Sequence, residues 1–442
     1  MSDSIHVVGA GLVGSLASLF LAQKGFRVDL YEGRPDMRKA DISAGRSINL
    51  VITSRGIKAV EKVGLKDKVM ALTLPIKGRM LHDVEGQTTY VPYGQKEGEV
   101  IYSISRGLLN KLLLEEADKN ENINIHFDKP CTGYDLKAKE LHFKDERVDT
   151  NIVFGTDGAF SPVRKAMLDQ FMNFNYSQSF LPQGYKELVI PPDKNGDYRI
   201  SKEHLHIWPR GDYMLMALPN LDGSFTCTLF LDYEGEQSFA ALQNKEDVIA
   251  FFEKVFPDVV PHMPSLAEDF FENPTGSLVT VKCAPWNVRG HACLMGDAAH
   301  AIVPFFGQGM NCGFEDCSIL DSLITKQNPD WNEVFEKFHE LRKPNSDAIA
   351  DMAIENFIEM RDKTADPKFQ LKKQVGFELE KRFPQKFIPR YSMVMFHPEI
   401  PYSEARRRSE AQDKLLDKLC ANINDANQTN WDEAESLVNK AL

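Results

Sequence analysis

The sequence predicts an α/β protein in which a domain of parallel strands and helices is interrupted by an antiparallel β-sheet and followed by a helical C-terminal region. Three observations support this prediction. A glycine-rich turn follows a short apolar strand near the N-terminus, alternating aromatic and β-branched residues fill the middle of the chain, and helical spacing dominates after residue 329.

Composition limits the possible functions of the chain. Its 442 residues allow one large domain or two interlocked domains, and its net charge of -12 argues against a nucleic-acid surface or a basic membrane patch. The seven cysteines are scattered without a CxxC pair, which favours reduced thiols and argues against structural zinc. The chain begins on a strand rather than a signal peptide and has no apolar run of about 18 residues. We therefore predict a cytoplasmic protein without metal and without a membrane anchor.

The first element is the glycine-rich turn GAGLVG at residues 9–14. It lies between a predicted buried strand at 5–8 and an apolar helix ending near Lys24, and a second strand at 26–31 ends before Glu32. Glycines in this context let a pyrophosphate approach the backbone at a helix N-terminus, and the acid can bind ribose hydroxyls. The motif predicts a Rossmann-like dinucleotide site without distinguishing NAD from FAD. Arg34 is either a second contact or a solvated arginine.

A second cofactor-facing loop is predicted after the next strands. We expect a strand at 101–105, a helix starting at Arg106, and a buried strand at 151–154. That last strand runs into the Gly155–Arg164 segment, where Asp157 lies just before a glycine. Its place at the end of a buried strand makes it a candidate for the phosphate side of the same nucleotide.

A candidate anion clamp lies in a predicted hairpin. Lys77–His82 and Val91–Gly94 have strand and turn character, so Arg79 and Tyr93 can face the same side of a small sheet. A guanidinium beside a phenol suits a carboxylate. The alternative is an exposed arginine beside a half-buried tyrosine.

The middle of the chain predicts the antiparallel sheet. Strands are expected at 185–190, 205–209, 213–218, 225–231 and 276–284, with a helix at 245–256. The predicted domains are therefore residues 1–75, 98–170 and 285–325 for the cofactor, 76–97 and 171–284 for the sheet and the substrate, and 326–442 for the helical region.

Two further glycine turns lie between Cys293 and Asp316. Gly296 precedes Asp297 and a short helix, and Gly307–Gly309 precedes a helix predicted at 310–324. Two helix N-termini aimed at one point suit a large polar cofactor with an anionic part. Ordinary strand-to-helix turns are the alternative.

The C-terminal region is predicted to be helical. We expect a helix to start at Pro344 and to run to about Lys363, with Asn356 and Glu359 on one face among methionines. This face is either functional or exposed to solvent. The charged segment from 402 to 442 predicts helices packed on the surface, and its role is open.

Several of these segments together resemble a known family. GAGLVG with Glu32, the Asp157–Gly158 pair and the Gly296–Asp297 pair are similar to the class A flavoprotein hydroxylases, which use one FAD. GRSINL, KGRMLH, PYG, SISR, LHIWPR, FTCTLF, GDAAHAIVPFFGQGMNCGFEDC, NFIEMR and RYSMVMF resemble the members that hydroxylate L-kynurenine. The resemblance spans about residues 4 to 400.

The resemblance implies two sets of site residues. FAD would be bound by Gly9, Gly11, Val13, Gly14, Tyr31, Glu32, Arg34, Arg106, Cys131, Asp157, Asp297, Gly309, Met310 and Asn311. L-Kynurenine would be bound by Arg79, Tyr93, Asn356, Glu359, Tyr391, Phe230, Pro304 and Phe306.

The resemblance also implies the chemistry. NADPH, binding transiently, would reduce the flavin, and O2 would supply the oxygen atom that the substrate ring takes up. The flavin carries this reaction, so no catalytic side chain is expected. A monomer or homodimer is expected. The alternatives are a flavin hydroxylase of another aromatic acid, a plain NAD dehydrogenase, and a non-catalytic protein that keeps the flavin fold.

Overall fold

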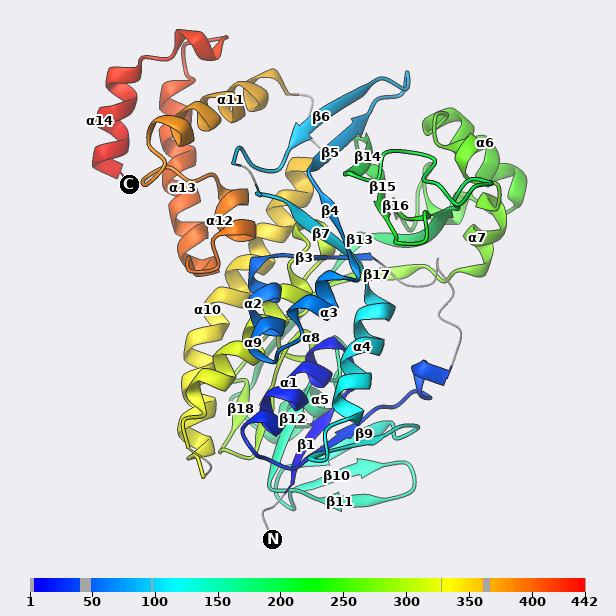
Figure 1. The fold of residues 1–442 in the computed structure, drawn as a ribbon, viewed down its shortest axis with the longest axis vertical. Helices are drawn as coiled ribbons and strands as arrows, with labels where there is room; N and C mark the ends of the chain where they lie inside the picture. The colour runs from blue at the N-terminus through cyan, green and yellow to red at the C-terminus, as the bar shows by residue number, and fades with distance from the viewer. Residues whose placement is uncertain (1–3, 40–48, 97, 327, 361–365, 442) are drawn as a thin grey trace.

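The computed structural model describes residues 4–39, 49–96, 98–326, 328–360 and 366–441 (Figure 1). It confirms the α/β fold class, with sheets followed by a helical C-terminal region. Two sequence predictions lie outside the described residues: the start of the GRSINL motif at 45–48, and the end of the helix predicted to reach Lys363.

A six-stranded sheet carries the glycine-rich turns. Its strand order is β18-β19-β12-β1-β2-β8, with every neighbouring pair parallel except β18 and β19. The carboxyl ends of β1, β2, β12 and β19 therefore meet at one edge of the sheet, where a ligand of an open parallel sheet binds. The strands are β1 (Ile5–Val8), β2 (Val28–Tyr31), β8 (Ile123–His126), β12 (Ile152–Gly155), β18 (Asn287–Val288) and β19 (Ala292–Leu294).

Helices cover this sheet, and two small sheets flank it. Helix α1 packs against both α4 and α9. The helices here are α1 (Leu12–Gln23), α2 (Ser54–Lys62), α3 (Lys66–Met70), α4 (Arg106–Asp118), α5 (Pro162–Gln170), α8 (Asp297–His300) and α9 (Gly309–Leu323). The small sheets are β3 (Asn49–Ile52) with β7 (Ile101–Ser105) and β4 (Thr73–Ile76), and β11 (Arg147–Asp149) with β10 (Glu140–Phe143) and β9 (Cys131–Asp135).

A seven-stranded sheet forms the second layer of the molecule. Its order is β17-β13-β16-β15-β14-β5-β6, and β14 with β5 is its one parallel pair among the described strands. Its strands are β5 (Gly78–His82), β6 (Thr88–Pro92), β13 (Asn175–Ile190), β14 (His204–Arg210), β15 (Tyr213–Pro219), β16 (Phe225–Asp232) and β17 (Gly276–Ala284).

Alternation along its strands gives this sheet two apolar faces. On β16, Leu229 and Leu231 pack into a core with Phe252 of α6 (Lys245–Val255), whereas Phe230 between them packs into a different core with Phe305. Successive side chains of a strand point to opposite faces, so one face is covered by α6 and α7 (Leu266–Glu272) and the other is turned toward the glycine turns.

The C-terminal region is helical, as predicted, but its first helix begins earlier than expected. Helix α10 runs without a break from Trp331 to Ile358, so the prediction of a start at Pro344 is wrong. Pro344 removes one backbone donor, but buried residues on both sides of it, among them Phe338 and Ile349, keep the helix packed. Tertiary packing therefore overrides the local effect of proline.

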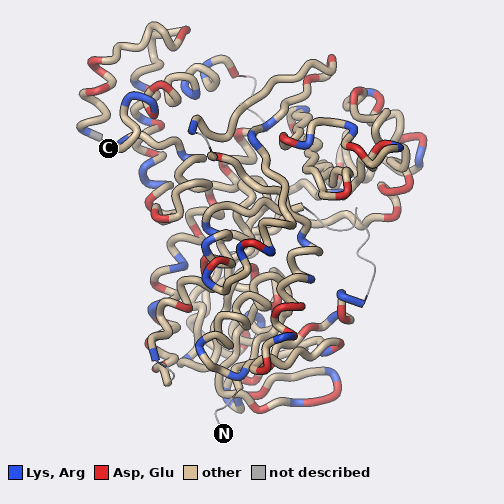
Figure 2. Tube along the Cα trace, viewed as in Figure 1, with Lys and Arg blue, Asp and Glu red and all other residues tan. Residues whose placement is uncertain are grey.

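Four more helices complete this region at one end of the molecule, beside β6 (Figure 1). They are α11 (Pro367–Arg382), α12 (Arg390–Phe396), α13 (Tyr402–Leu419) and α14 (Trp431–Ala441). Single-turn helices lie at Met37–Lys39, Phe239–Ala241, Val260–His262, Pro304–Phe306 (η4) and Ala426–Gln428. Acidic and basic residues are scattered among uncharged ones over the described part of the chain (Figure 2). Among the described helices, none has both the length and the apolar character needed to cross a membrane.

Candidate active site

One long cavity of about 770 Å³ runs between the two large sheets. At one end it is lined by the glycine turn after β1, in its middle by the starts of α4, α8 and α9, and at its far end by aromatic residues of the sheet and of α12. This volume and the largely apolar wall are typical of a site that encloses a small molecule or cofactor.

The nucleotide end of the cavity is built largely from backbone. A Cβ atom on Gly14 would lie 1.9 Å from the Gly9 carbonyl oxygen, so close packing requires glycine there. Gly11 is different, because a Cβ on it would have no neighbour within 4 Å and would occupy the cavity. Helix α1 starts after Gly11 without a side-chain cap or an acid in its first turn. Its first N–H groups therefore remain available to an anion, which fits the pyrophosphate of FAD.

Glu32 closes this end of the cavity. Its carboxylate accepts hydrogen bonds from the Ala10 N–H (3.1 Å) and from Arg34 Nε (2.8 Å). Burial acts to raise the pKa of Glu32, but the hydrogen bonds and charge of Arg34 hold that pKa below its ordinary value. Glu32 is therefore a fixed anion at the end of β2, in the place where a ribose hydroxyl pair is bound in this type of fold.

Asp157 has one carboxylate oxygen that lacks a hydrogen-bond donor. Its Oδ2 accepts from the Val163 N–H (3.1 Å), whereas its buried Oδ1 has no hydrogen-bond partner among the described residues. Burial raises the pKa of Asp157 to about 6. Because Asp157 lines the cavity, a bound hydroxyl or N–H group of FAD would satisfy this oxygen and favour its ionised form.

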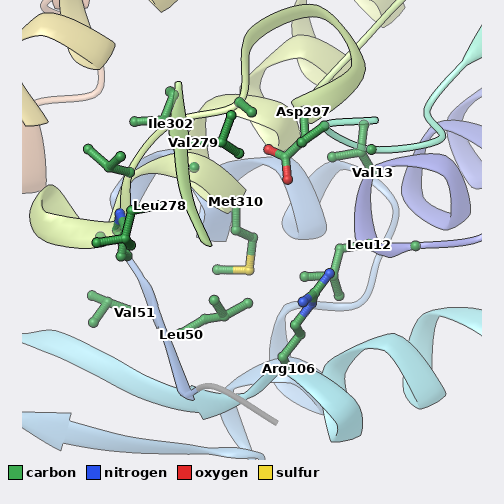
Figure 3. A pocket seen from close by; sticks show the side chains of 18 of the residues that line it. Leu12, Val13, Leu50, Val51, Arg106, Leu278, Val279, Asp297, Ile302 and Met310 are labelled. Atoms are coloured by element: carbon green, nitrogen blue, oxygen red, sulfur yellow. The ribbon is translucent and has the colours of Figure 1, made fainter. Parts of the chain in front are cut away.

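The middle of the cavity lies between two opposing walls. Figure 3 shows Asp297 on one wall, Arg106 on the opposite wall, and Met310 between them. Asp297 follows Gly296, whose φ of +58° favours glycine, and a Cβ at that position would come within 2.9 Å of Val13. Helix α9 begins at Gly309 and Met310, so its positive N-terminal end is directed at the cavity.

The far end of the cavity is built from side chains of three separate segments. The guanidinium of Arg79 lies 5.4 Å from the ring of Tyr93 and 5.1 Å from the ring of Tyr391, and these rings stack 5.0 Å apart. Burial acts to lower the pKa of Arg79, but the nearby Tyr93, Tyr391 and Glu359 hold that pKa above its ordinary value. The Nε of Arg79 is buried without a hydrogen-bond partner. A cation with a free donor beside two phenols is suited to a carboxylate.

Most of the predicted site residues line this one cavity. Those predicted for FAD and present in its wall are Gly9, Gly11, Val13, Tyr31, Glu32, Arg34, Arg106, Cys131, Asp157, Asp297, Gly309 and Met310. Those predicted for the substrate and present in its wall are Arg79, Tyr93, Phe230, Pro304, Phe306 and Tyr391.

Four predicted residues lie behind the wall instead. Gly14 is inside the turn, and Glu359 is half-buried beyond the end of α10. The Asn356 amide donates to the Phe305 carbonyl (2.7 Å), and Asn311 bonds the Thr53 N–H (2.9 Å) and the Val51 carbonyl (2.8 Å). These amides hold backbone segments of the wall in place, and any direct ligand contact by the four stays a prediction.

The large sheet also contributes apolar and hydroxyl-bearing residues to the wall that were not predicted from the sequence. Thr226, Thr228 and Phe230 are spaced two residues apart on β16, and all three line the cavity. On β15, Met216 and Leu218 are also two residues apart and line it. Because a strand alternates its faces, counting back from Phe230 identifies both threonines.

A buried charged cluster lies behind the two later glycine turns. His300, Cys312 and Asp316 place their side-chain donor atoms within 4.8 Å of one another, the one such group among the described residues. Arg342 already donates to Asp316 (2.7 Å) and to the sulfur of Cys312 (3.4 Å), so the cluster is neutralised by a guanidinium. Burial acts to lower the pKa of His300, but Asp316 keeps it well above its ordinary value. The cluster therefore has the character of an ion-pair network.

The sequence matches a known protein family and named relatives. Residues 2–352 match the family model described as an FAD binding domain. The chain is 46% identical over 446 residues to kynurenine 3-monooxygenase of Myxococcus xanthus, covering 100% of this chain and 96% of the relative. It is also 46% identical over 447 residues to the enzyme of the same name from Flavobacterium johnsoniae, covering 100% of this chain and 99% of the relative.

Solved structures show the same fold at low sequence identity. The tetrameric form of 2-methyl-3-hydroxypyridine-5-carboxylic acid oxygenase matches with a TM-score of 0.68 at 19% identity, covering 86% of this chain and 98% of that one. At this identity the likeness concerns the fold alone.

Proposed function

Because the chain belongs to the family of FAD-dependent kynurenine 3-monooxygenases, we propose that it hydroxylates L-kynurenine and that Arg79 binds the substrate carboxylate. The proposal for Arg79 rests on its guanidinium, which lies beside the stacked rings of Tyr93 and Tyr391, at the end of the cavity away from Glu32. The substrate ring would then lie toward the start of α9, beside the flavin.

FAD occupies the rest of the cavity in this proposal. Gly11 and the start of α1 face its pyrophosphate, Glu32 its adenosine ribose, and Asp297 its ribityl chain, with Arg106 on the opposite wall. The separate glycine turns, the unpartnered Asp157 oxygen and the length of the cavity all support this placement. When bound and reduced by NADPH, FAD supplies the oxygen chemistry that side chains cannot perform.

The residues of this chain have three tasks. Arg79 and the two phenols fix the substrate by its carboxylate and so orient the ring. Phe230, Pro304 and Phe306 exclude water from the reacting atoms. The N-terminal end of α9 stabilises negative charge that develops beside it. The aromatic amine of kynurenine activates the neighbouring ring carbon itself, so the site needs no strong base.

A hydroxylase acting on another aromatic acid is the second candidate, because Arg79 would bind any carboxylate. NADPH oxidation with L-kynurenine distinguishes the two, with the product identified by mass. A product heavier by one oxygen atom supports the proposal. NADPH oxidation that L-kynurenine does not accelerate, with no such product, contradicts it.

We also propose the cellular setting and the division of the chain. Seven free thiols support a reducing, cytoplasmic location, and light scattering would distinguish a monomer from a homodimer. The strands of the six-stranded sheet support a discontinuous FAD domain at 1–75, 98–170 and 285–325. Those of the seven-stranded sheet support a substrate domain at 76–97 and 171–284, before the helical region at 326–442.

A further inference from the structure

A tyrosine at the start of helix α13 contacts the glycine turn on the flavin side of the cavity. Tyr402 is the first residue of α13 and is 0% exposed. Its hydroxyl donates a hydrogen bond of 2.7 Å to Oε1 of Gln308, which is also 0% exposed. Gln308 lies between Gly307 and Gly309 and directly precedes α9, so this bond is made to the turn from which the helix starts.

The hydrogen bond from this hydroxyl is stronger than the other side-chain hydrogen bond of Gln308. The amide nitrogen of Gln308 donates only to the sulfur of Met395 (3.1 Å), a weak acceptor. The backbone of the turn is held by hydrogen bonds from the Gly307 N–H to the Pro304 carbonyl (2.8 Å) and from the Asn311 amide to the Gly307 carbonyl (2.9 Å), and the Tyr402 hydroxyl adds a bond to the Gln308 side chain. Without that hydroxyl, the buried amide oxygen of Gln308 would lose its partner, which favours a shift of the side chain and of the turn that carries it.

Tyr402 is itself held rigidly. The guanidinium of Arg55 lies 4.0 Å above its ring, and Arg55 donates to Glu315 of α9 and to the Ile400 carbonyl, both at 2.5 Å. The other oxygen of Glu315 accepts from Arg342. Tyr402 is therefore held by a network of ion pairs with Glu315 of α9, and it bonds the residue that precedes this helix.

The same network reaches the other glycine turn. Arg342 donates to Asp316, and the second oxygen of Asp316 accepts from the Gly296 N–H (3.1 Å). Gly296 precedes Asp297, which lines the cavity. Both turns that face the flavin are thus tied to one buried set of charges that extends into the C-terminal region.

We propose that Tyr402 is a positioning residue for FAD: through Gln308 it fixes the Gly307–Gly309 turn, and so directs the positive end of α9 at the flavin ring. The C-terminal segment from Tyr402 onward, whose role the sequence leaves open, thereby completes the cofactor site. This inference rests on the FAD placement proposed above and is independent of the substrate.

The test is a double-mutant cycle on the FAD-depleted full-length protein. Tyr402→Phe removes the hydroxyl and keeps the ring under Arg55, and Gln308→Met removes the acceptor at similar volume. Tyr198→Phe is the matched control, because it removes a hydroxyl hydrogen bond of the same length, to the Asn220 carbonyl (2.7 Å), and neither residue lines the cavity. FAD affinity is measured by flavin fluorescence titration, and the flavin reduction potential by equilibrium with reference dyes.

Tyr402→Phe should weaken FAD binding about threefold to tenfold, as expected for one buried hydrogen bond, and should make the reduction potential more negative. In the Gln308→Met background the same change should have no further effect. Tyr198→Phe should leave both quantities unchanged.

Two results would overturn the inference. One is an unchanged affinity and potential in Tyr402→Phe, and the other is additive effects of the Tyr402 and Gln308 substitutions. Because no measurement in the cycle uses kynurenine, a failure here is separate from a failure of the proposed substrate.

Discussion

The two ends of the cavity recognise their ligands by different means. At the nucleotide end the wall is formed largely by backbone, with Gly9 and Gly11 allowing an anion close to a helix terminus. At the substrate end the wall is formed by side chains, with Arg79 beside Tyr93 of the same hairpin and Tyr391 of the remote helix α12. Substitutions at the first end should therefore act through shape, and those at the second through charge and hydrogen bonding.

The largest effect is expected from Arg79→Ala. Loss of the buried cation should raise the KM for L-kynurenine about a hundredfold, because the substrate carboxylate would enter a cavity without its partner. Steady-state NADPH oxidation measures this. FAD content should stay at the wild-type level, since Arg79 lies at the opposite end from Glu32.

Arg34→Ala is the matched control at the nucleotide end. It should weaken FAD binding and leave the KM for L-kynurenine unchanged. If Arg79→Ala instead lost FAD while keeping its KM, the division of the cavity into two ends would be wrong.

Asp157→Asn should change the stability of the FAD-free protein. The pKa of Asp157 in the folded state is about 6, above its ordinary value of 3.8, so its stabilising effect is complete below 3.8 and is lost as pH rises through about 6. Near pH 7 the ionised group destabilises the fold, and asparagine should raise the free energy of unfolding by about 2 kcal/mol.

Urea unfolding near pH 7 and near pH 5 checks this. The increase in the free energy of unfolding caused by Asp157→Asn should be smaller at the lower pH, where the wild-type carboxyl becomes protonated. A loss of stability in Asp157→Asn at both pH values would show that the carboxylate is already satisfied without FAD.

Gly11→Ala and Gly14→Ala distinguish ligand approach from internal packing. The added methyl at Gly11 projects into the cavity, so FAD affinity should fall about tenfold while the FAD-free protein keeps its stability. The methyl at Gly14 would meet the Gly9 carbonyl, so the FAD-free protein should itself lose stability. Thermal unfolding with and without FAD measures both, and equal behaviour of the two variants would refute the distinction.

The smallest effect is expected from Tyr391→Phe. The ring that stacks on Tyr93 remains and one hydroxyl is lost, so the KM for L-kynurenine should rise about threefold. Product analysis should show unchanged hydroxylation. A rise in KM as large as that expected for Arg79→Ala would mean that the phenol contributes as much to substrate binding as the guanidinium does.

The same contrast explains what the sequence could predict. The nucleotide end follows from one contiguous motif, because a strand, a glycine turn and a helix start are local structures. Arg79 and Tyr93 were paired because a hairpin brings them together within one short segment. Such local relations can be recognised from the sequence without knowledge of the three-dimensional structure.

Relations across the fold were not predictable in this way. The hydrogen bond from Tyr402 to Gln308 joins residues 94 positions apart, and no local pattern marks either of them. The Asn356 amide likewise donates to the Phe305 carbonyl, a partner that depends on tertiary packing, and its contact with the ligand stays a prediction. Helix α10 continues through Pro344 for the same reason, since contacts with distant segments stabilise it.

The most direct test compares L-kynurenine with its decarboxylated analogue in the wild type and in Arg79→Ala. In the wild type we expect a product heavier by one oxygen atom from L-kynurenine, and a much higher KM for the analogue. In Arg79→Ala the two compounds should have similar KM values, because the group that distinguishes them is gone. An absence of hydroxylated kynurenine, or an Arg79→Ala variant that still prefers the carboxylate, would contradict the account.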